Sequence, residues 1–255
     1  MDYRIHYNSQ VQGRDSLRYI FVISHMRSFS SLLCHILGSH GEIDGYAETH
    51  QSYYDRTDLH RLTREVQETT GAPVAGKYVL DKMLNDQQHI APGVLARSNV
   101  RVLFLVRNAE ETIRSILNMA HAAGSKGRFS DPVRVVDYYA TRLQQLESYS
   151  AQLGRNALFL ESERLLSDTE AVLYGLSRWL DLDEPLSTSY KTFKFSGVGG
   201  YGDPSPNIMT GTVIKDADHR HRTYVPILIP EEILRRGREV YATCHETLLK
   251  RHDRP

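Results

Sequence analysis

Four short apolar segments constrain the fold of this chain more than any other feature of its sequence. The first opens the stretch YIFVISHMRSFSSLLCHILG (19–38), and the others are KYVL (77–80), VRVLFLV (100–106) and NALFLE (156–161). Their Val, Leu, Ile and Phe residues follow one another without the polar alternation of a strand that has one face in water. Such runs are typical of strands covered on both faces, as in a parallel sheet.

Helical patterns lie between these segments. Residues 30–37 carry an apolar stripe, and Gly38 follows as a predicted C-terminal cap. A second helix is predicted over 108–120, because Asn108 can cap it and Glu111 follows three residues later, as in a capping box. Further helices are predicted at 132–153, 167–181 and 230–251. Alternating strands and helices predict an α/β fold, a three-layer sandwich around a central, mostly parallel sheet.

The length of 255 residues suits one large domain or two small ones. We predict a single domain over 1–255, with a polar lead-in at 1–18. The irregular segment 194–226 is rich in Gly, Pro, Ser and Asp and too long for a simple connection, which is typical of a functional lid or a disordered loop. The two cysteines, Cys34 and Cys244, fall in apolar helical patterns and are predicted to be reduced, buried thiols.

The charge of the chain is balanced, with 31 basic and 31 acidic residues. A general nucleic-acid binder gains much of its affinity by neutralising many phosphates, so this balance argues against nucleic acid as a partner. The N-terminal residues are polar, and no segment approaches the roughly 20 apolar residues of a membrane span. We therefore expect no membrane span and a cytoplasmic location.

The turn after the first apolar segment has the composition of an anion site. Arg27, Ser28, Ser30 and Ser31 stand together at the start of the predicted helix. Helix N-termini attract anions, and the guanidinium fork of arginine matches phosphate-type oxygens. A serine-capped helix with a surface arginine would explain the turn equally well. The sequence lacks G-x-x-x-x-G-K-[ST], so magnesium-dependent hydrolysis of a nucleoside triphosphate is poorly supported.

A second candidate anion site follows the apolar segment 100–106. Arg107 ends this predicted strand, where α/β folds bind ligands, and Ser115 lies two turns into the next helix. Their side chains are expected to converge on one anion, although Arg107 could instead pair with Glu110 or Glu111. Two anion sites at one edge of a sheet suit a ligand with two separated phosphate groups.

These two motifs resemble those of the sulfotransferase family, which uses 3′-phosphoadenosine 5′-phosphosulfate (PAPS) and has a P-loop-NTPase-like architecture. Its first turn reads R-S-G-T-T-L or K-S-G-T-T-W, and a strand-end Arg with a later Ser forms its second motif. The residues that the resemblance assigns to the 5′-phosphosulfate are Arg27, Ser28, Phe29 through its N–H, Ser30 and Ser31. Those that it assigns to the 3′-phosphate are Arg107 and Ser115.

Further segments extend the resemblance to residues 19–216. GYAETH (45–50) is similar to the G-E-E-T-R region of tyrosylprotein sulfotransferases, which implies that Glu48 is the catalytic base. GDPSPNIMTGTVIK resembles the loop that covers the donor and ends at Lys215, a further implied donor contact. The chain departs from the family at Phe29, where Gly is usual, at Ser162, where Tyr is usual, and at His50, where the tyrosylprotein enzymes have Arg.

The resemblance implies transfer of a sulfuryl group from PAPS to a hydroxyl of a small-molecule acceptor, by in-line displacement and without a metal ion. Arg27 would stabilise the leaving 5′-phosphate, and adenosine 3′,5′-bisphosphate would be the product. His50 is the rival of Glu48 as the base because imidazole titrates nearer neutrality. Lys77 and Lys82 flank the next predicted strand; one of them could reach the sulfonate, but the preferred interpretation is an exposed lysine that pairs with Asp81 or Asp86. The acceptor pocket is expected in loops 45–60, 121–132 and 194–226.

Two other functions remain open from the sequence. One is a nucleotide-dependent small-molecule kinase, which would need magnesium and a carboxylate to hold it. The other is a non-catalytic nucleotide-binding protein that keeps the same turn. A homodimer is possible, and the acceptor is not identified.

Overall fold

The centre of the computed structural model, which describes residues 17–153, 156–204, 206–215 and 227–255, is a parallel sheet of five strands. The strand order is β2-β3-β1-β4-β5, and each neighbouring pair is parallel. The bounds are β1 Arg18–Ser24, β2 Ile43–Asp44, β3 Tyr78–Met83, β4 Val100–Val106 and β5 Ala157–Glu161. The α/β class and the parallel sheet predicted from the sequence are confirmed.

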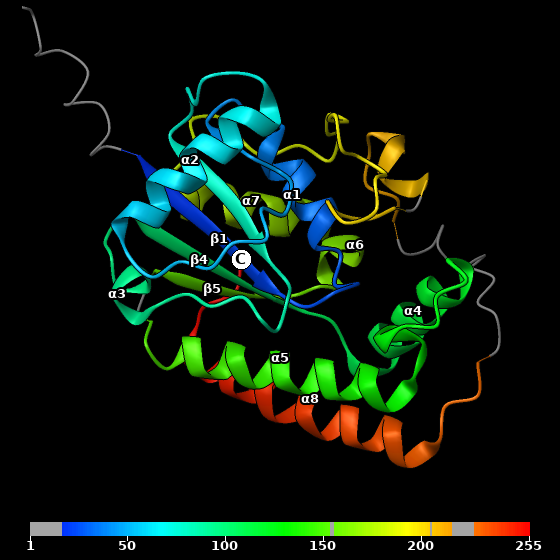
Figure 1. Cartoon of the computed structure of the whole chain (residues 1–255). Helices are drawn as coiled ribbons and strands as arrows, with labels where there is room; N and C mark the ends of the chain where they lie inside the picture. Colours follow the sequence, from blue (N-terminus) through cyan, green and yellow to red (C-terminus); the bar gives the residue numbers. More distant parts are fainter. Residues whose placement is uncertain (1–16, 154–155, 205, 216–226) are drawn as a thin grey trace, which may run out of the picture.

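Helices cover both faces of this sheet (Figure 1). The helices that pack on one face are α1 Ser30–Gly38, α6 Arg164–Ser167 and α7 Thr169–Leu180. Those on the other are α2 Arg56–Thr70, α4 Ala109–Ala122, α5 Pro132–Ser150 and α8 Glu231–Arg251. The shorter elements are α3 Pro92–Leu95 and the 3-10 helices η2 Arg128–Ser130 and η3 Pro206–Thr210.

The continuous apolar runs follow from this two-sided cover. In β1, Ile20 and Val22 join the cluster that includes α1 and α7, whereas Phe21 and Ile23 join the cluster that includes α5 and α8. Both clusters exclude water, so neither side of the strand carries polar residues. The apolar run of β1 thus follows directly from its place between β3 and β4.

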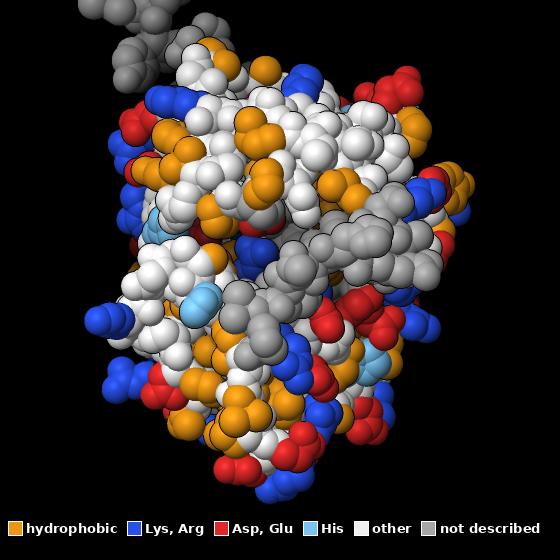
Figure 2. All heavy atoms as spheres, turned by 90° about the vertical axis from the view of Figure 1, so that its right-hand side faces the viewer, with side chains coloured by type: hydrophobic (Ala, Val, Ile, Leu, Met, Phe, Trp, Pro, Cys, Tyr) orange, Lys and Arg blue, Asp and Glu red, His pale blue; other side chains and the backbone are white. Residues whose placement is uncertain are grey.

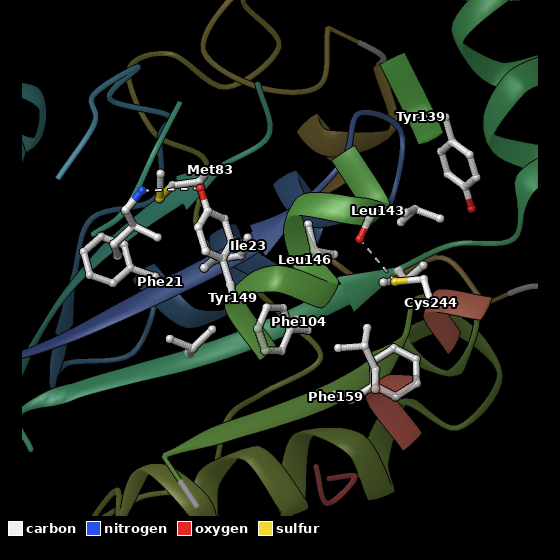
Figure 3. Close-up of a cluster of buried hydrophobic side chains, with 14 of the residues drawn as sticks. Phe21, Ile23, Met83, Phe104, Tyr139, Leu143, Leu146, Tyr149, Phe159 and Cys244 are labelled. Carbon is white, nitrogen blue, oxygen red and sulfur yellow. Dashed lines mark hydrogen bonds between the residues drawn. The ribbon is translucent and has the colours of Figure 1, made fainter. Parts of the chain in front are cut away.

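The core beneath the sheet is made mainly by α5 and α8, which run side by side (Figure 1). Figure 3 shows Phe104 and Phe159 of the sheet close to Leu143 of α5 and Cys244 of α8. The thiol of Cys244 contacts the carbonyl oxygen of Leu143 at 3.6 Å. Cys34 and Cys244 are both buried and free, as the sequence predicted.

Two sequence-based predictions of helix ends were wrong. Gly38 is the last residue of α1 rather than its cap, and Ser39 follows it in a right-handed conformation. Glycine is needed there for close approach, because a Cβ on Gly38 would lie 2.3 Å from the carbonyl oxygen of Gly45. The predicted helix over 132–153 ends at Ser150.

Six of the described elements were not predicted, namely β2, α2 and the short helices α3, α6, η2 and η3. β2 is too short to leave a pattern, but α2 has a capping box in which Asp55 accepts hydrogen bonds from Thr57 N and Asp58 N. Leu59, Leu62 and Val66 form its buried stripe, so the signal for this helix was present in the sequence. Within the described residues, no helix is long and apolar enough to cross a membrane.

Candidate active site

The candidate site lies at the carboxyl ends of β1, β3 and β4, the edge where open parallel sheets bind ligands. The loop 25–29 joins β1 to α1 and, with loops that follow β3 and β4, lines a cavity of about 360 Å³. Figure 2 faces the right-hand side of Figure 1, where these strands end, and shows a recess with a Lys or Arg side chain at its floor. A positively charged side chain therefore lies at the bottom of the recess.

The first turn of α1 has no side-chain cap. Its N-cap residue is Phe29, and its first turn contains no acidic residue. Ser28 does not cap the helix, because it is buried and donates its hydroxyl to the carbonyl oxygen of His25 at 2.7 Å. The interpretation as a serine-capped helix is therefore wrong. Helix N–H groups without such a cap, at the positive end of the helix dipole, form an anion site.

The loop before α1 holds two non-glycine residues in the left-handed backbone region. The φ angle is 64° at Arg27 and 62° at Phe29. Each costs about 1–2 kcal/mol for a residue with a Cβ. The ring of Phe29 lies over the guanidinium of Arg107, with 4.3 Å between Cζ and the ring centroid, and this cation–π contact offsets part of the cost.

Arg27 holds a central position in the site. Its Nε donates to Ser115 Oγ at 3.0 Å, and its Nη1 pairs with Asp203 Oδ1 at 2.7 Å. Ser115 comes from α4 and Asp203 from the loop after α7, so three distant parts of the chain meet at this guanidinium. The side chain of Ser115 was expected to converge with that of Arg107, but its hydroxyl contacts Arg27 instead.

Arg107 lies directly beside this cluster. Its Nη1 donates to the carbonyl oxygen of Arg27 at 3.1 Å, and its Nη2 pairs with Glu111 at 3.1 Å. The alternative pairing with Glu111 is therefore present, and it coexists with the approach of the two arginines. Arg27, Arg107 and Ser115 together form a compact basic group beside the N-terminus of α1.

A buried imidazole connects the two loops that carry the arginines. His25 Nε2 accepts the backbone N–H of Arg107 at 3.0 Å, so its Nδ1 carries the proton and donates to the carbonyl oxygen of Met26 at 2.9 Å. Burial lowers the pKa of His25 to about 3. The ring is therefore neutral and fixes the end of β1 relative to the end of β4.

Glu48 and His50 both face the cavity. Residues 45–50 form no strand, and His50 has a φ of 57°. Glu48 Oε1 lies 3.5 Å from His50 Nδ1, and the side chain of Glu48 is only 10% exposed whereas that of His50 is 51% exposed. Burial raises the pKa of Glu48, and the charge of Lys82 opposes that rise.

Lys82 was considered in the sequence as a lysine that could reach the sulfonate, but an exposed position was preferred. It lies in β3 and is 1% exposed, and its Nζ donates to Ser31 Oγ at 3.2 Å. The expectation of an exposed lysine was wrong. The sequence did carry a signal, because Lys82 interrupts the apolar strand YVLDKM at its carboxyl end, where a buried charge has to meet a ligand or a polar partner.

Asp81, the neighbour of Lys82, holds the segment that carries Glu48. It is fully buried and accepts hydrogen bonds from the backbone N–H of Thr49 at 3.1 Å, from Thr49 Oγ1 at 2.8 Å and from Tyr53 OH at 2.6 Å. The predicted pairing of Lys82 with Asp81 is thus replaced by this network. It fixes Thr49, which lies between the two candidate bases.

The loop after α7 covers one side of the cavity. Gly200 accepts a hydrogen bond at its carbonyl oxygen from His50 Nε2 at 2.6 Å. A Cβ on Gly202 would lie 3.1 Å from Ser31 Oγ, so this backbone runs close to the first turn of α1. His35 of α1 anchors the same loop through Ser196 Oγ at 2.7 Å. The expectation that part of 194–226 covers the site agrees with the described residues of that range.

Lys215 does not line the cavity. Its Nζ pairs with Glu170 of α7 at 2.9 Å on the surface, so its implied contact with the donor stays a prediction. The remainder of the predicted loop, 216–226, lies outside the described residues, as does most of the lead-in 1–18. Ser162 is buried behind β5, and its hydroxyl has no hydrogen-bond partner among the described residues.

Comparison with known proteins identifies the fold. No family model and no curated protein matches the sequence. A solved structure described as a sulfotransferase domain from the curacin biosynthetic pathway is similar, with a TM-score of 0.57 and 18% sequence identity. The match covers 92% of this chain and 98% of that domain.

The chain has a sulfotransferase fold. The fold agrees with the resemblance that the sequence motifs indicated. At this level of identity the likeness concerns the arrangement of the elements, so the chemistry has to be argued from the side chains of this chain.

Proposed function

We propose that the protein is a sulfotransferase that moves a sulfuryl group from PAPS to a hydroxyl group of a small molecule. One observation carries the proposal. The uncapped N-terminus of α1 and two arginines line one cavity, a buried lysine, Lys82, contacts Ser31 of this lining, and a buried carboxylate, Glu48, faces the same space. The sulfotransferase fold supports it.

The basic group would bind the two charged ends of the donor. Arg27, Ser30 and Ser31 lie at the α1 N-terminus and would hold the 5′-phosphosulfate, and Lys82 beside Ser31 would add a positive charge near the sulfonate. Arg107 would hold the 3′-phosphate. Preorganised donors of this kind stabilise charge that develops on a leaving oxygen, and the loss of one typically costs about 3–4 kcal/mol of barrier.

A small apolar hollow next to the cavity would receive one edge of the adenine. Its volume is about 40 Å³, and it shares Phe29, Leu32 and Asp203 with the main cavity. Leu166, Tyr190 and Ile208 are among its other lining residues. A purine between such side chains would lie on the α6 side of Phe29, with its phosphates toward the basic group.

Glu48 is the proposed general base. The oxygen–sulfur bond to the 5′-phosphate breaks while the acceptor oxygen bonds to sulfur, and the acceptor proton passes to Glu48 Oε. Burial raises the pKa of this carboxyl, which makes it a better proton acceptor at neutral pH than an ordinary glutamate. His50 contacts Glu48 and can stabilise its charge or take the proton in its place.

Transfer of labelled sulfate from PAPS to a panel of phenols and alcohols tests this function. We expect Glu48→Gln to lower kcat by about 10²–10⁴-fold, the usual contribution of a general base, and to leave the Kd of adenosine 3′,5′-bisphosphate within about twofold of wild type. Glu68→Gln on the exposed face of α2 is the matched control and should behave like wild type.

Calorimetry separates the competing functions. The sulfotransferase proposal expects adenosine 3′,5′-bisphosphate to bind more tightly than ATP with magnesium. The opposite order would favour a kinase. Bisphosphate binding without transfer to any acceptor would favour a non-catalytic nucleotide-binding protein. Unchanged turnover in Glu48→Gln, combined with a loss in His50→Gln, would move the role of base to His50.

A further inference from the structure

The cavity has a second part that none of the proposed donor contacts uses. Its apolar lining, here called the acceptor wall, comes from the end of β1, the end of β3, α4, η2 and α5. The acceptor wall consists of Met26, Leu84, Met119, Phe129 and Tyr138. Because the wall and Glu48 line the same cavity, a molecule on the wall can present a hydroxyl to that carboxylate.

Tyr138 contributes its ring and not its hydroxyl to this wall. Its OH accepts the backbone N–H of Met26 at 2.8 Å and donates to the carbonyl oxygen of Leu84 at 2.7 Å. Both functions of the phenol are therefore occupied by backbone groups. Phe129 packs edge-on against the ring, with 5.4 Å between centroids. This part of the wall thus offers aromatic and thioether surface, which suits an apolar ligand.

Arg128, a cation that lies against the aromatic rings of the wall, is held by a carboxylate. Its Nη1 and Nη2 donate to the two oxygens of Asp86, at 3.2 and 2.5 Å. The guanidinium lies over the rings of Phe129 and Tyr138, at 5.3 and 5.5 Å. Gln145 holds Asp86 in place, because Gln145 Nε2 donates to the backbone carbonyl oxygen of Asp86 at 2.7 Å. The pair is bidentate and its net charge is zero.

We propose that the acceptor is an uncharged hydroxyl compound with an apolar body, and that Asp86 sets this preference by keeping Arg128 neutralised. The inference rests on the proposed sulfotransferase function. A carboxylate acceptor would lose hydration against the wall and find the nearby guanidinium already paired. An ammonium group would find the carboxylate of Asp86 engaged in the same way. A neutral phenol loses little on entering.

Three phenols that differ in charge test the proposal. They are 4-ethylphenol, 3-(4-hydroxyphenyl)propionate and tyramine, which share the reacting group and have similar lengths. We expect kcat/KM for the neutral compound to exceed that for each charged one by at least tenfold. Calorimetric binding of each, to the protein alone and with adenosine 3′,5′-bisphosphate, should give the same order.

A substitution at Asp86 tests the residue assigned to this preference. Asp86→Asn removes the charge that holds Arg128, so the ratio of kcat/KM for the propionate to that for 4-ethylphenol should rise about tenfold. Asp168→Asn is the matched control, because Asp168 pairs with Arg164 at 3.0 Å outside the cavity, and the ratio should not change. The calorimetric order in wild type does not depend on whether the Asp86 variant folds.

The outcomes separate this inference from the reaction itself. Transfer to all three phenols with similar kcat/KM would overturn the uncharged-acceptor inference and leave the sulfotransferase function in place. Selective binding of 4-ethylphenol without sulfate transfer would support the acceptor wall and overturn the proposed reaction. An unchanged ratio in folded Asp86→Asn would remove Asp86 as the residue that sets the preference.

Discussion

His25 shows how a residue that never meets a ligand can control the geometry of a charged site. It is fully buried, and its two nitrogens bond to the backbone at Met26 and Arg107. A protonated imidazole could not accept the N–H of Arg107 and would add a positive charge beside two arginines. Burial therefore lowers its pKa to about 3, with the charges of Arg107 and Arg142 as further causes.

This shift predicts a pH dependence of stability. In the unfolded chain His25 takes up a proton as the pH falls below about 6.5, whereas in the folded protein it stays neutral down to about pH 3. The unfolded state thus binds more protons in this window, so the free energy of unfolding falls as the pH falls, by up to about 1.4 kcal/mol per pH unit from this group. Above about pH 6.5 its contribution is constant.

Denaturant unfolding between pH 6.5 and 4.5 checks this expectation. His25→Gln should flatten the dependence of the unfolding free energy on pH by about 1 kcal/mol per unit relative to wild type. His121→Gln, at an exposed position in α4, is the comparison and should leave the slope unchanged. Equal slopes in wild type and His25→Gln would show that the imidazole does not titrate differently on folding.

At the same scale, some site residues could be predicted from the sequence and others could not. Arg27 and Ser31 follow a strand and start a helix, a local pattern that a sequence shows directly. Lys82 was expected to be exposed because the predicted strand ended at residue 80, and its hydrogen-bond partner Ser31 lies 51 residues away in the sequence. Asp203 was not predicted because its contact with Arg27 spans 176 positions and no local pattern marks it.

At the scale of elements, β3 and the segment 45–53 form one unit. The buried carboxylate of Asp81 in β3 accepts three hydrogen bonds from Thr49 and Tyr53, and Glu48 is the residue before Thr49. Burial raises the pKa of Asp81, while these hydrogen bonds lower it. Asp81 is therefore a positioning residue, and its expected effect is on the base and not on the donor.

Asp81→Asn should separate these two roles. An amide keeps one acceptor oxygen and adds a donor that faces Thr49 and Tyr53, so we expect stability to fall by about 1–3 kcal/mol. The value of kcat should fall at least tenfold, while the Kd of adenosine 3′,5′-bisphosphate stays within about twofold. Thr49→Ser, which keeps the hydroxyl, should retain most of the activity. A parallel loss of bisphosphate binding would indicate general disorder and contradict the positioning role.

The elements themselves were predicted to different extents. β4 and β5 were recognised because both faces are covered, and the cap of α4 was correct, since Asn108 Oδ1 accepts the N–H of Glu111 at 2.9 Å. β2 has only two residues, and its place beside β3 depends on the tertiary fold. α2 was missed although its pattern is clear, because the apolar content of RTDLHRLTREVQETT is low and its charged residues suggest a loop.

At the scale of the whole molecule, the loop after α7 places a carboxylate, that of Asp203, inside the site. Asp203 pairs with Arg27 at 2.7 Å, where the donor phosphate is proposed to bind. A donor that takes this guanidinium has to displace the carboxylate, so loop release and donor binding are coupled. The side chains of both partners are largely shielded, at 21% and 25% exposure, which strengthens their competition with the ligand.

Asp203→Asn is predicted to raise the affinity for adenosine 3′,5′-bisphosphate about fivefold, which corresponds to the ~1 kcal/mol of a partly exposed ion pair. Calorimetry at low and at physiological salt checks the value, and the gain should shrink as salt screens the pair. Glu239→Gln, which removes a surface pair with Arg235 on α8, should have no effect. Weaker binding in Asp203→Asn would mean that the carboxylate helps to hold the ligand.

The division of the cavity has a practical consequence for protein engineering. Apart from Met26, the acceptor wall comes from residues 84–138, and the loop and helix start proposed to hold the 5′-phosphosulfate are residues 27–31, but Arg107, proposed to hold the 3′-phosphate, lies within the range of the wall. Libraries directed at Leu84, Met119 and Phe129 can therefore change which alcohol is accepted while the residues proposed to bind the donor stay the same.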